Sequence, residues 1–175
     1  MHGQMRRAAE RPTKATASRR PRGILTRERI LDSAEIVFAT EGPGASLRTI
    51  MDRAAVNVAS IHYHFGSREQ LLDQIIARRA IIINRQRLAL LDKAIKADPN
   101  DVSQILRALI QPAITLAMER DGWLYYFQLL GRLESGAEDI YGSIMSNYYS
   151  ATHLAFLNAL TKSLPTLSGE SLVWR

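Results

Sequence analysis

The chain has 175 residues, of which 46% are hydrophobic and 23% charged, and it contains no cysteine. This length and composition suit one domain or two small ones built around a hydrophobic core. The lack of cysteine excludes disulfides, thiol catalysis and zinc sites with cysteine ligands. No apolar run approaches the roughly 18 residues that a membrane-spanning helix needs, so we do not expect an integral membrane protein.

The net charge of +6 comes entirely from residues 1–23, which hold seven basic side chains and one acidic side chain. The rest of the chain is neutral, with sixteen of each. Most of the remaining residues in this leading segment are small or polar, so the segment buries too little apolar surface to fold. We therefore predict that residues 1–23 form a disordered basic arm of the kind that binds nucleic acid. The alternative is a tail with no role.

Apolar residues at helical spacing predict a first helix, with Thr26 as its N-cap. Its inward face consists of Ile30, Ala34, Val37 and Phe38. The sequence EGPG at 41–44 then interrupts the helix, because two glycines flank a proline there. Ser46 is the expected N-cap of a short second helix that ends near Ala55.

A third short helix follows a tight turn at Val56, with Asn57 as its expected N-cap. Ile61 and Phe65, four residues apart, should face inward and Gly66 should end the helix. The inward direction of these two residues leaves Ala59, Ser60 and Tyr63 pointing away from the core, with Val58, His62 and His64 on the flanks. Ser67 and Gln70 then have the spacing of a capping box, which predicts a fourth helix running to about Ala97.

Downstream, the sequence DPND at 98–101 separates the fourth helix from one that begins at Val102 and contains a predicted kink at Pro112. An aromatic stretch occupies 122–133, and a last long helix is expected over 138–163. No segment alternates apolar and polar residues as a strand does, so we predict an all-α protein.

Two short helices joined by a tight turn have the geometry of a helix-turn-helix. Small residues such as Ala59 and Ser60 allow a helix to approach base edges in the major groove. Tyr63 and His64 can donate to phosphate oxygens, and Arg68 adds a charge beside free backbone N–H groups. A metal site at His62 and His64 is a weaker interpretation, because residues two apart on a helix diverge and no carboxylate stands four residues on. We expect no metal, no cofactor and no catalytic residue, since no enzyme motif is present.

Residues 27–72 resemble the DNA-binding domain of the tetracycline-repressor (TetR) family of bacterial transcription regulators. The features that carry the resemblance are Ile50, the turn Ala54-Ala55-Val56, the helix end Tyr63-His64-Phe65, and the helix entry Gly66-Ser67-Arg68-Glu69. Three residues depart from the family pattern. Ala55 stands where glycine is usual, Asn57 where serine or threonine is usual, and His62 where tyrosine is frequent.

The resemblance implies a helix-turn-helix domain over 24–70 and a larger helical effector-binding and dimerisation domain over 71–175. By position, base contacts are implied for Val58, Ala59 and His62. Contacts to the DNA backbone are implied for Ser60, Tyr63, His64 and Arg68. Supporting contacts are implied for Thr26 and Arg27 at the start of the first helix, and for Ser46, Arg48 and Thr49.

Aromatic and methionine side chains of the second domain, together with one arginine, are candidates for an effector cavity. They are Met118, Trp123, Tyr126, Phe127, Arg132, Tyr141, Met145 and Tyr148. Tyrosine hydroxyls, Gln128 and Arg132 would provide polar groups for a small, mostly apolar effector. The alternative is that these residues form core and dimer interface, as aromatic residues at helical spacing usually do.

The resemblance further implies a homodimer that pairs through its last long helices, for which 138–163 is the candidate here. A further helix is expected after Ser168, and the resemblance implies that this domain is cut short relative to the family. The expected function is a cytoplasmic, nucleoid-associated transcription regulator, usually a repressor, which binds a double-stranded operator and is released by an effector. The alternative is an architectural or protein-interaction module that uses no ligand.

Overall fold

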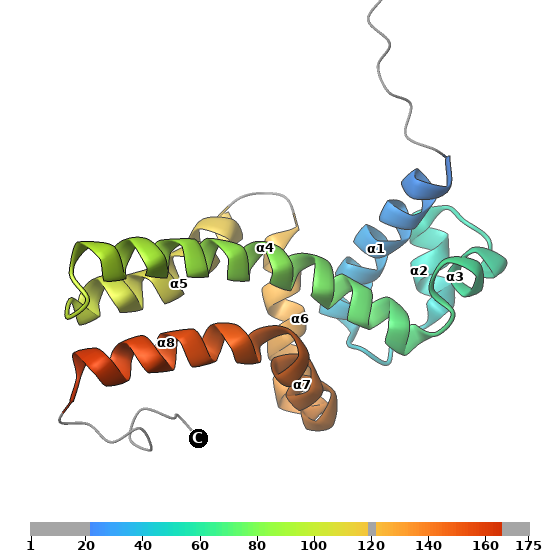
Figure 1. Cartoon of the computed structure of the whole chain (residues 1–175). Helices are drawn as coiled ribbons and strands as arrows, with labels where there is room; N and C mark the ends of the chain where they lie inside the picture. The colour runs from blue at the N-terminus through green and yellow to red at the C-terminus, as the bar shows by residue number, and fades with distance from the viewer. Residues whose placement is uncertain (1–21, 119–121, 166–175) are drawn as a thin grey trace, which may run out of the picture.

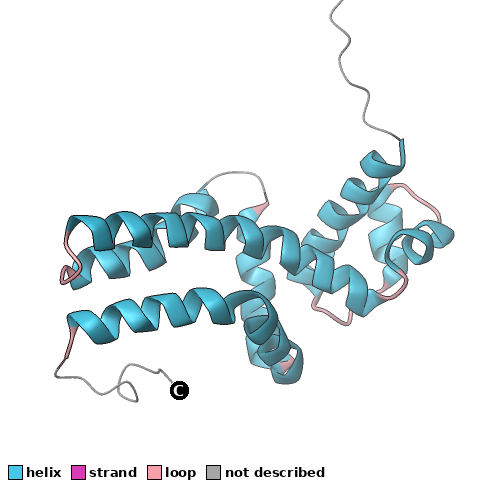
Figure 2. Cartoon of the chain, viewed as in Figure 1, coloured by secondary structure: helices cyan, strands magenta, loops and turns pink. Residues whose placement is uncertain are grey.

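The computed structural model describes residues 22–118 and 122–165, and these residues form helices joined by short turns (Figure 2). No strand occurs in these two ranges, and the all-α prediction is confirmed. The α-helices are α1 (Arg22–Glu41), α2 (Leu47–Ala54), α3 (Val58–Phe65), α4 (Arg68–Ala97), α5 (Val102–Met118), α6 (Trp123–Gly136), α7 (Glu138–Ile144) and α8 (Ser150–Ser163). A π-helical segment, η1 (Met145–Tyr149), connects α7 to α8.

The start of α1 differs from the prediction. The helix begins at Arg22, so Thr26 lies in its second turn and is not the N-cap. The predicted arm lies outside the described residues apart from its last two positions, Arg22 and Gly23, which belong to α1.

The helix ends around α2 and α4 follow the predicted local chemistry. The Ser46 hydroxyl accepts a hydrogen bond from the Arg48 backbone N–H at 3.1 Å, which confirms the N-cap of α2. Ser67 and Gln70 form both bonds of a capping box at the start of α4. Gly66 supplies the left-handed turn between α3 and α4, with φ of 76°. These contacts fix the direction in which the chain leaves α3.

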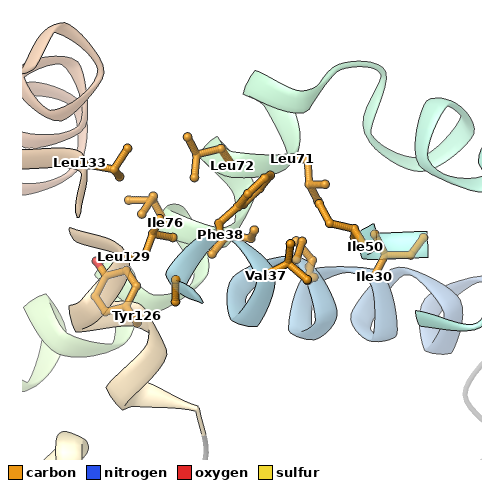
Figure 3. Packing of buried hydrophobic residues seen from close by; sticks show 14 of the residues in the cluster. Ile30, Val37, Phe38, Ile50, Leu71, Leu72, Ile76, Tyr126, Leu129 and Leu133 are labelled. Atoms are coloured by element: carbon orange, nitrogen blue, oxygen red, sulfur yellow. The ribbon is translucent and has the colours of Figure 1, made fainter. Parts of the chain in front are cut away.

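One hydrophobic core joins the first three helices to the second half of the chain. Phe38 of α1 and Ile76 of α4 lie in the same cluster as Tyr126 of α6, and each is fully buried (Figure 3). The inward-facing pair of α3, Ile61 and Phe65, also belongs to this cluster and is buried as predicted. The helix-turn-helix therefore packs directly on the helices that follow it.

The far half of α4 lies side by side with α5 and α8 (Figure 1). A second cluster holds these three helices together, and it consists of Leu91, Ile105, Ala108, Phe156 and Ala159. The Arg87 Nε donates to the Leu109 carbonyl at 2.9 Å, which adds a polar tie between α4 and α5. Pro112 is buried inside α5, which continues to Met118.

Residues 138–163 are helical throughout, as predicted, but they do not form one straight helix, because the chain changes direction between α7 and α8 (Figure 1). The π segment inserts one extra residue into the helical register, so Tyr149 is buried and Tyr148 only half-buried. Asn84 of α4 donates to the Tyr148 carbonyl at 2.7 Å within this segment. Three residues from other helices therefore bond to the π segment. Asn84 donates to the Tyr148 carbonyl, Asp73 accepts from the Tyr148 hydroxyl, and the Tyr126 hydroxyl pairs with that of Tyr149.

Candidate nucleic-acid interface

The outer face of α3 is the most exposed aromatic surface of the helix-turn-helix. Tyr63 retains 84% of its accessible surface, the highest value among the large hydrophobic residues that the structure describes. Ala59 and His62 are exposed on the same short helix, while Ile61 and Phe65 hold its other face in the core. Exposing a tyrosine ring costs hydrophobic free energy, so a face of this kind is typical of a binding surface.

Two histidines, His62 and His64, make contacts near Tyr63 on α3. The His64 ring lies edge-on to Tyr63, with centroids 5.0 Å apart and planes at 80°. The His62 Nδ1 lies 3.0 Å from the Gly66 carbonyl oxygen, which can only accept, so Nδ1 carries the proton of that bond. A neutral His62 in this bond is therefore unprotonated at Nε2, and the residue is exposed.

The side chains of Val58 and Ser60 lie outside the described part of the structure, although their backbone belongs to α3. Of the predicted supporting residues, Arg48 is exposed and Thr49 is half-buried near the start of α2. The hydroxyl of exposed Ser46 caps α2. Their contacts with DNA stay predictions.

Arg68 and Arg27 have partners within the chain. The Arg68 Nη1 donates to the Gly44 carbonyl at 2.9 Å, which ties the 42–45 turn to the first turn of α4. The Arg27 guanidinium lies 5.4 Å from the centre of the Phe65 ring and donates to Gln74. Arg27 lies in the second turn of α1, so the predicted position at the helix start is wrong.

Arg29 is a positioning residue that the sequence analysis missed. Its guanidinium donates to the carbonyls of Ala54 and Ala55 at the end of α2. Ala55 itself is left-handed, with φ of 50°, and is the only residue other than glycine with positive φ in the described ranges. An arginine within α1 carries no local signal for this contact, because its acceptors lie 25 and 26 residues further along the chain.

A buried carboxylate joins the helix-turn-helix to the second half. Glu35 of α1 is 2% exposed and forms ion pairs with Arg78 and Arg79 of α4 at 2.5 and 2.8 Å. The Arg79 guanidinium also lies 4.8 Å from the centre of the Trp123 ring at the start of α6. Farther along α6, Arg132 donates to the carbonyls of Ala39 and Thr40 at the end of α1. Helix α6 is thus held to α1 near both of its ends.

The predicted effector residues are spread over different environments. Trp123 and Tyr126 are buried in the main core, whereas Met118 is 79% exposed. Arg132 bonds to α1 carbonyls, so it is occupied in packing rather than free to act as a polar handle. The other members, Phe127, Tyr141, Met145 and Tyr148, are half-buried.

The buried tyrosines of this region pair with each other. The hydroxyls of Tyr126 and Tyr149 form a hydrogen bond, and burial raises the pKa of both. The nearby Arg87 is half-buried, and this burial lowers its pKa. These contacts give the predicted effector region a polar centre inside an apolar shell, while its role as a ligand site stays a prediction.

Neither a metal site nor a membrane span emerges from the described residues. No group of three or more histidine or acidic side chains is arranged to hold a metal ion there. Within the same ranges, every helix is too short or too polar to cross a bilayer.

Two family models match the sequence. The model of bacterial regulatory proteins of the tetR family matches residues 30–75, which span most of α1 through the start of α4. The model of the tetracyclin repressor-like C-terminal domain matches residues 107–175. No curated protein matches the chain.

One solved structure agrees in fold, and a second shows a weaker likeness. A protein from Shewanella sp. PV-4 that is assigned to the tetR family of transcription regulators is 22% identical, with a TM-score of 0.59. The similarity covers 81% of this chain and 71% of that one. The TetR transcription regulatory protein from Mycobacterium vanbaalenii is also 22% identical, with a TM-score of 0.46 over 82% of this chain and 75% of that one. With both family models matched in order along a helical chain, this protein belongs to the TetR family of DNA-binding transcription regulators.

Proposed function

We propose that the protein is a homodimeric repressor that reads a specific operator through α3 and is released from it by a small-molecule effector. The observation that carries the proposal is the outer face of α3, where Tyr63 is 84% exposed on a helix whose other face is buried. The proposed place of action is the bacterial cytoplasm, at the nucleoid.

The chemistry of this face suits a major groove. Ala59 lets the helix backbone approach base edges and can contact a thymine methyl group. Neutral His62 offers Nε2 as an acceptor, which complements the amino group of adenine or cytosine. The Tyr63 hydroxyl and the exposed Arg48 would bond to phosphate oxygens and fix the register of the helix.

Dimerisation follows from the way such domains read DNA. Two recognition helices related by a twofold axis bind two half-sites about one helical turn apart. The outer side of α8 is the proposed pairing surface, and Leu154 is 57% exposed there. This surface lies within residues 138–163, the segment for which the sequence predicts dimer pairing. In the structure this segment consists of α7, η1 and α8.

Effector release requires that the second domain act on the first. An effector that moves α6 would act on α1 through Trp123, Arg79 and Glu35, and through Arg132 at the other end. A small, mostly apolar molecule with a few hydrogen-bonding groups is the proposed ligand, bound among the aromatic residues around Tyr126. The effector would favour the arrangement of the two reading heads that does not fit the operator.

A titration by fluorescence anisotropy tests the DNA-reading part. Wild-type protein is added to a fluorescently labelled duplex selected from a random library and, separately, to a labelled scrambled duplex, at a series of salt concentrations. The proposal predicts a preference of at least about a hundredfold for the selected duplex, with two protein chains bound per site. Equal affinity for both duplexes, lost on deletion of residues 1–21, would assign binding to the basic segment and reject operator reading.

A thermal-shift screen separates this function from the alternative, a helix-turn-helix module without a ligand. Small, mostly apolar compounds are screened for a rise in the Tm of wild-type protein and of Tyr126→Phe. A compound that stabilises the wild type and stabilises the variant less supports the effector. A screen in which no compound distinguishes the two proteins favours the module without a ligand.

A further inference from the structure

A groove of about 440 Å³ lies between the first turns of α4 and helix α7. Its lining residues are Glu69, Gln70, Leu72, Asp73, Asp139, Ile140, Ser143 and Ile144. None of them belongs to the residues proposed above for the effector, and none lies on the outer face of α3. The volume is within the range of pockets that hold small organic molecules, about 300–1,000 Å³.

The groove has an apolar floor. Leu72 and Ile144 are each 5% exposed and so belong to the core, while Ile140 keeps 41% of its surface accessible. A ligand that covered Ile140 would remove apolar surface from water without disturbing the two buried residues. The floor therefore favours a ligand with an apolar body.

The polar part of the lining carries negative charge. Glu69, Asp73 and Asp139 are the charged residues of the lining, and no basic side chain lines the groove. None of the three forms an ion pair with a described residue. The nearest arginine in the sequence, Arg68, donates to the Gly44 carbonyl. The groove thus lacks a cation of its own.

Helix-terminal electrostatics account for only part of this charge. Glu69 and Asp139 lie in the first turns of α4 and α7, where acidic residues favourably complement the helix dipole. Asp73 lies one turn further along α4 and accepts a hydrogen bond from the neutral Tyr148 hydroxyl at 2.6 Å. Burial and the adjacent Asp73 raise the pKa of Tyr148 to about 12, so the Tyr148 hydroxyl stays neutral near neutral pH and does not compensate the charge of Asp73.

We propose that this groove binds an amphiphilic organic cation, with its apolar body on Ile140 and its positive group between Asp73 and Asp139. Such a ligand makes apolar contact with the floor and also neutralises the uncompensated carboxylates, whereas a neutral or anionic molecule does at most one of these. None of the proposed effector residues lines the site, although one of them, Tyr148, adjoins it through its hydrogen bond to Asp73. The site lies beside Gln70, whose side chain completes the capping box after α3, so a bound cation would sit next to the joint that positions the recognition helix.

Isothermal titration calorimetry without DNA tests the site independently of operator binding. The probe is tetraphenylphosphonium, and the control is tetraphenylborate, which has nearly the same size and the opposite charge. We expect the phosphonium to bind at least about tenfold more tightly than the borate, because the carboxylates attract one and repel the other.

Variants locate the binding. The double variant Asp73→Asn/Asp139→Asn should weaken phosphonium binding roughly tenfold, and the amide oxygen introduced at position 73 can still accept the hydrogen bond from Tyr148. Ser143→Trp, at an exposed lining position, should fill the groove and abolish binding. Asp92→Asn removes a carboxylate from the distant half of α4 and should leave binding unchanged.

Two results would overturn the proposal. One is equal binding of the two probe ions, which would mean unspecific adsorption on apolar surface. The other is wild-type phosphonium affinity in both the double variant and Ser143→Trp, with melting temperatures that show both proteins folded. That result would place any binding outside this groove.

Discussion

The joint between α3 and α4 and the joint between α7 and α8 both redirect the helical chain, but they do so with different chemistry. The first uses Gly66 and the Ser67–Gln70 capping box, all within five consecutive residues. The second uses a π turn, with contacts to Asn84 and Tyr126 from other helices. The helix-turn-helix is thus specified largely by local contacts, and the second domain by contacts between segments far apart in the sequence.

Removing the carboxylate that joins the two regions should have the largest effect. Glu35→Ala leaves Arg78 and Arg79 without their shared buried partner, and should lower the free energy of unfolding by about 3–5 kcal/mol. Urea unfolding followed by circular dichroism measures the loss. Asp32→Ala is the matched control, because this residue pairs with Arg78 while 64% exposed, and should cost less than about 1 kcal/mol. Equal costs for the two variants would refute the role assigned to Glu35.

The local joint is tested by Gly66→Ala. A Cβ at this position would lie 2.3 Å from the Gln70 Oε1, and the backbone has φ of 76°. The variant should therefore lose about 2 kcal/mol through strain and a weakened cap. Gly131→Ala in α6 is the control, since a Cβ there meets no atom within 4 Å, and it should be neutral or slightly stabilising. A neutral Gly66→Ala would mean that the cap does not depend on this geometry.

A substitution with a smaller expected effect should stabilise the helix-turn-helix. Ala55 adopts φ of 50° at the end of α2, a conformation that glycine reaches without steric cost. Ala55→Gly should therefore raise the free energy of unfolding by about 1 kcal/mol, measured in the same urea titration. A loss of stability would show that the left-handed turn is not strained at this residue.

The smallest expected effect is a pH dependence in the second domain. His153 is exposed but stacks on Tyr149, with ring centroids 5.8 Å apart. This partial desolvation, and then the positive charge of Arg87, lower the pKa of His153. The unfolded chain then binds this proton more readily than the folded one, so stability falls as the pH drops below about 6.5. Between pH 7 and pH 5 the Tm of wild-type protein should fall further than that of His153→Gln. An equal fall in Tm for the two proteins over this pH range would contradict the role assigned to His153.

Local signals allow much of the helix-turn-helix to be predicted from the sequence. Ser46 and the Ser67–Gln70 pair mark helix starts within a few residues, and Ile61 with Phe65 sets the inward face of α3. The start of the first helix is misplaced at Thr26 because a threonine can cap a helix or lie within it.

Contacts between distant segments cannot be predicted in this way. The acceptors of Arg29 lie about 25 residues further along the chain, and Glu35 meets its arginines only after α4 packs against α1. The π turn before α8 likewise depends on Asn84, over sixty residues earlier. The apolar spacing through 138–163 is compatible with one straight helix, and the contacts that accompany the change of register, those of Tyr148 and Tyr149, come from distant helices.

The most direct test of the central claim, that the outer face of α3 reads DNA, is the operator affinity of Tyr63→Ala. Tyr63 is 84% exposed, so its removal should leave the Tm unchanged while weakening binding to the selected duplex about tenfold or more. Leu124→Ala, 65% exposed on α6, is the control and should bind as the wild type does. Wild-type affinity in a folded Tyr63→Ala protein would contradict the assignment of α3 as the recognition helix.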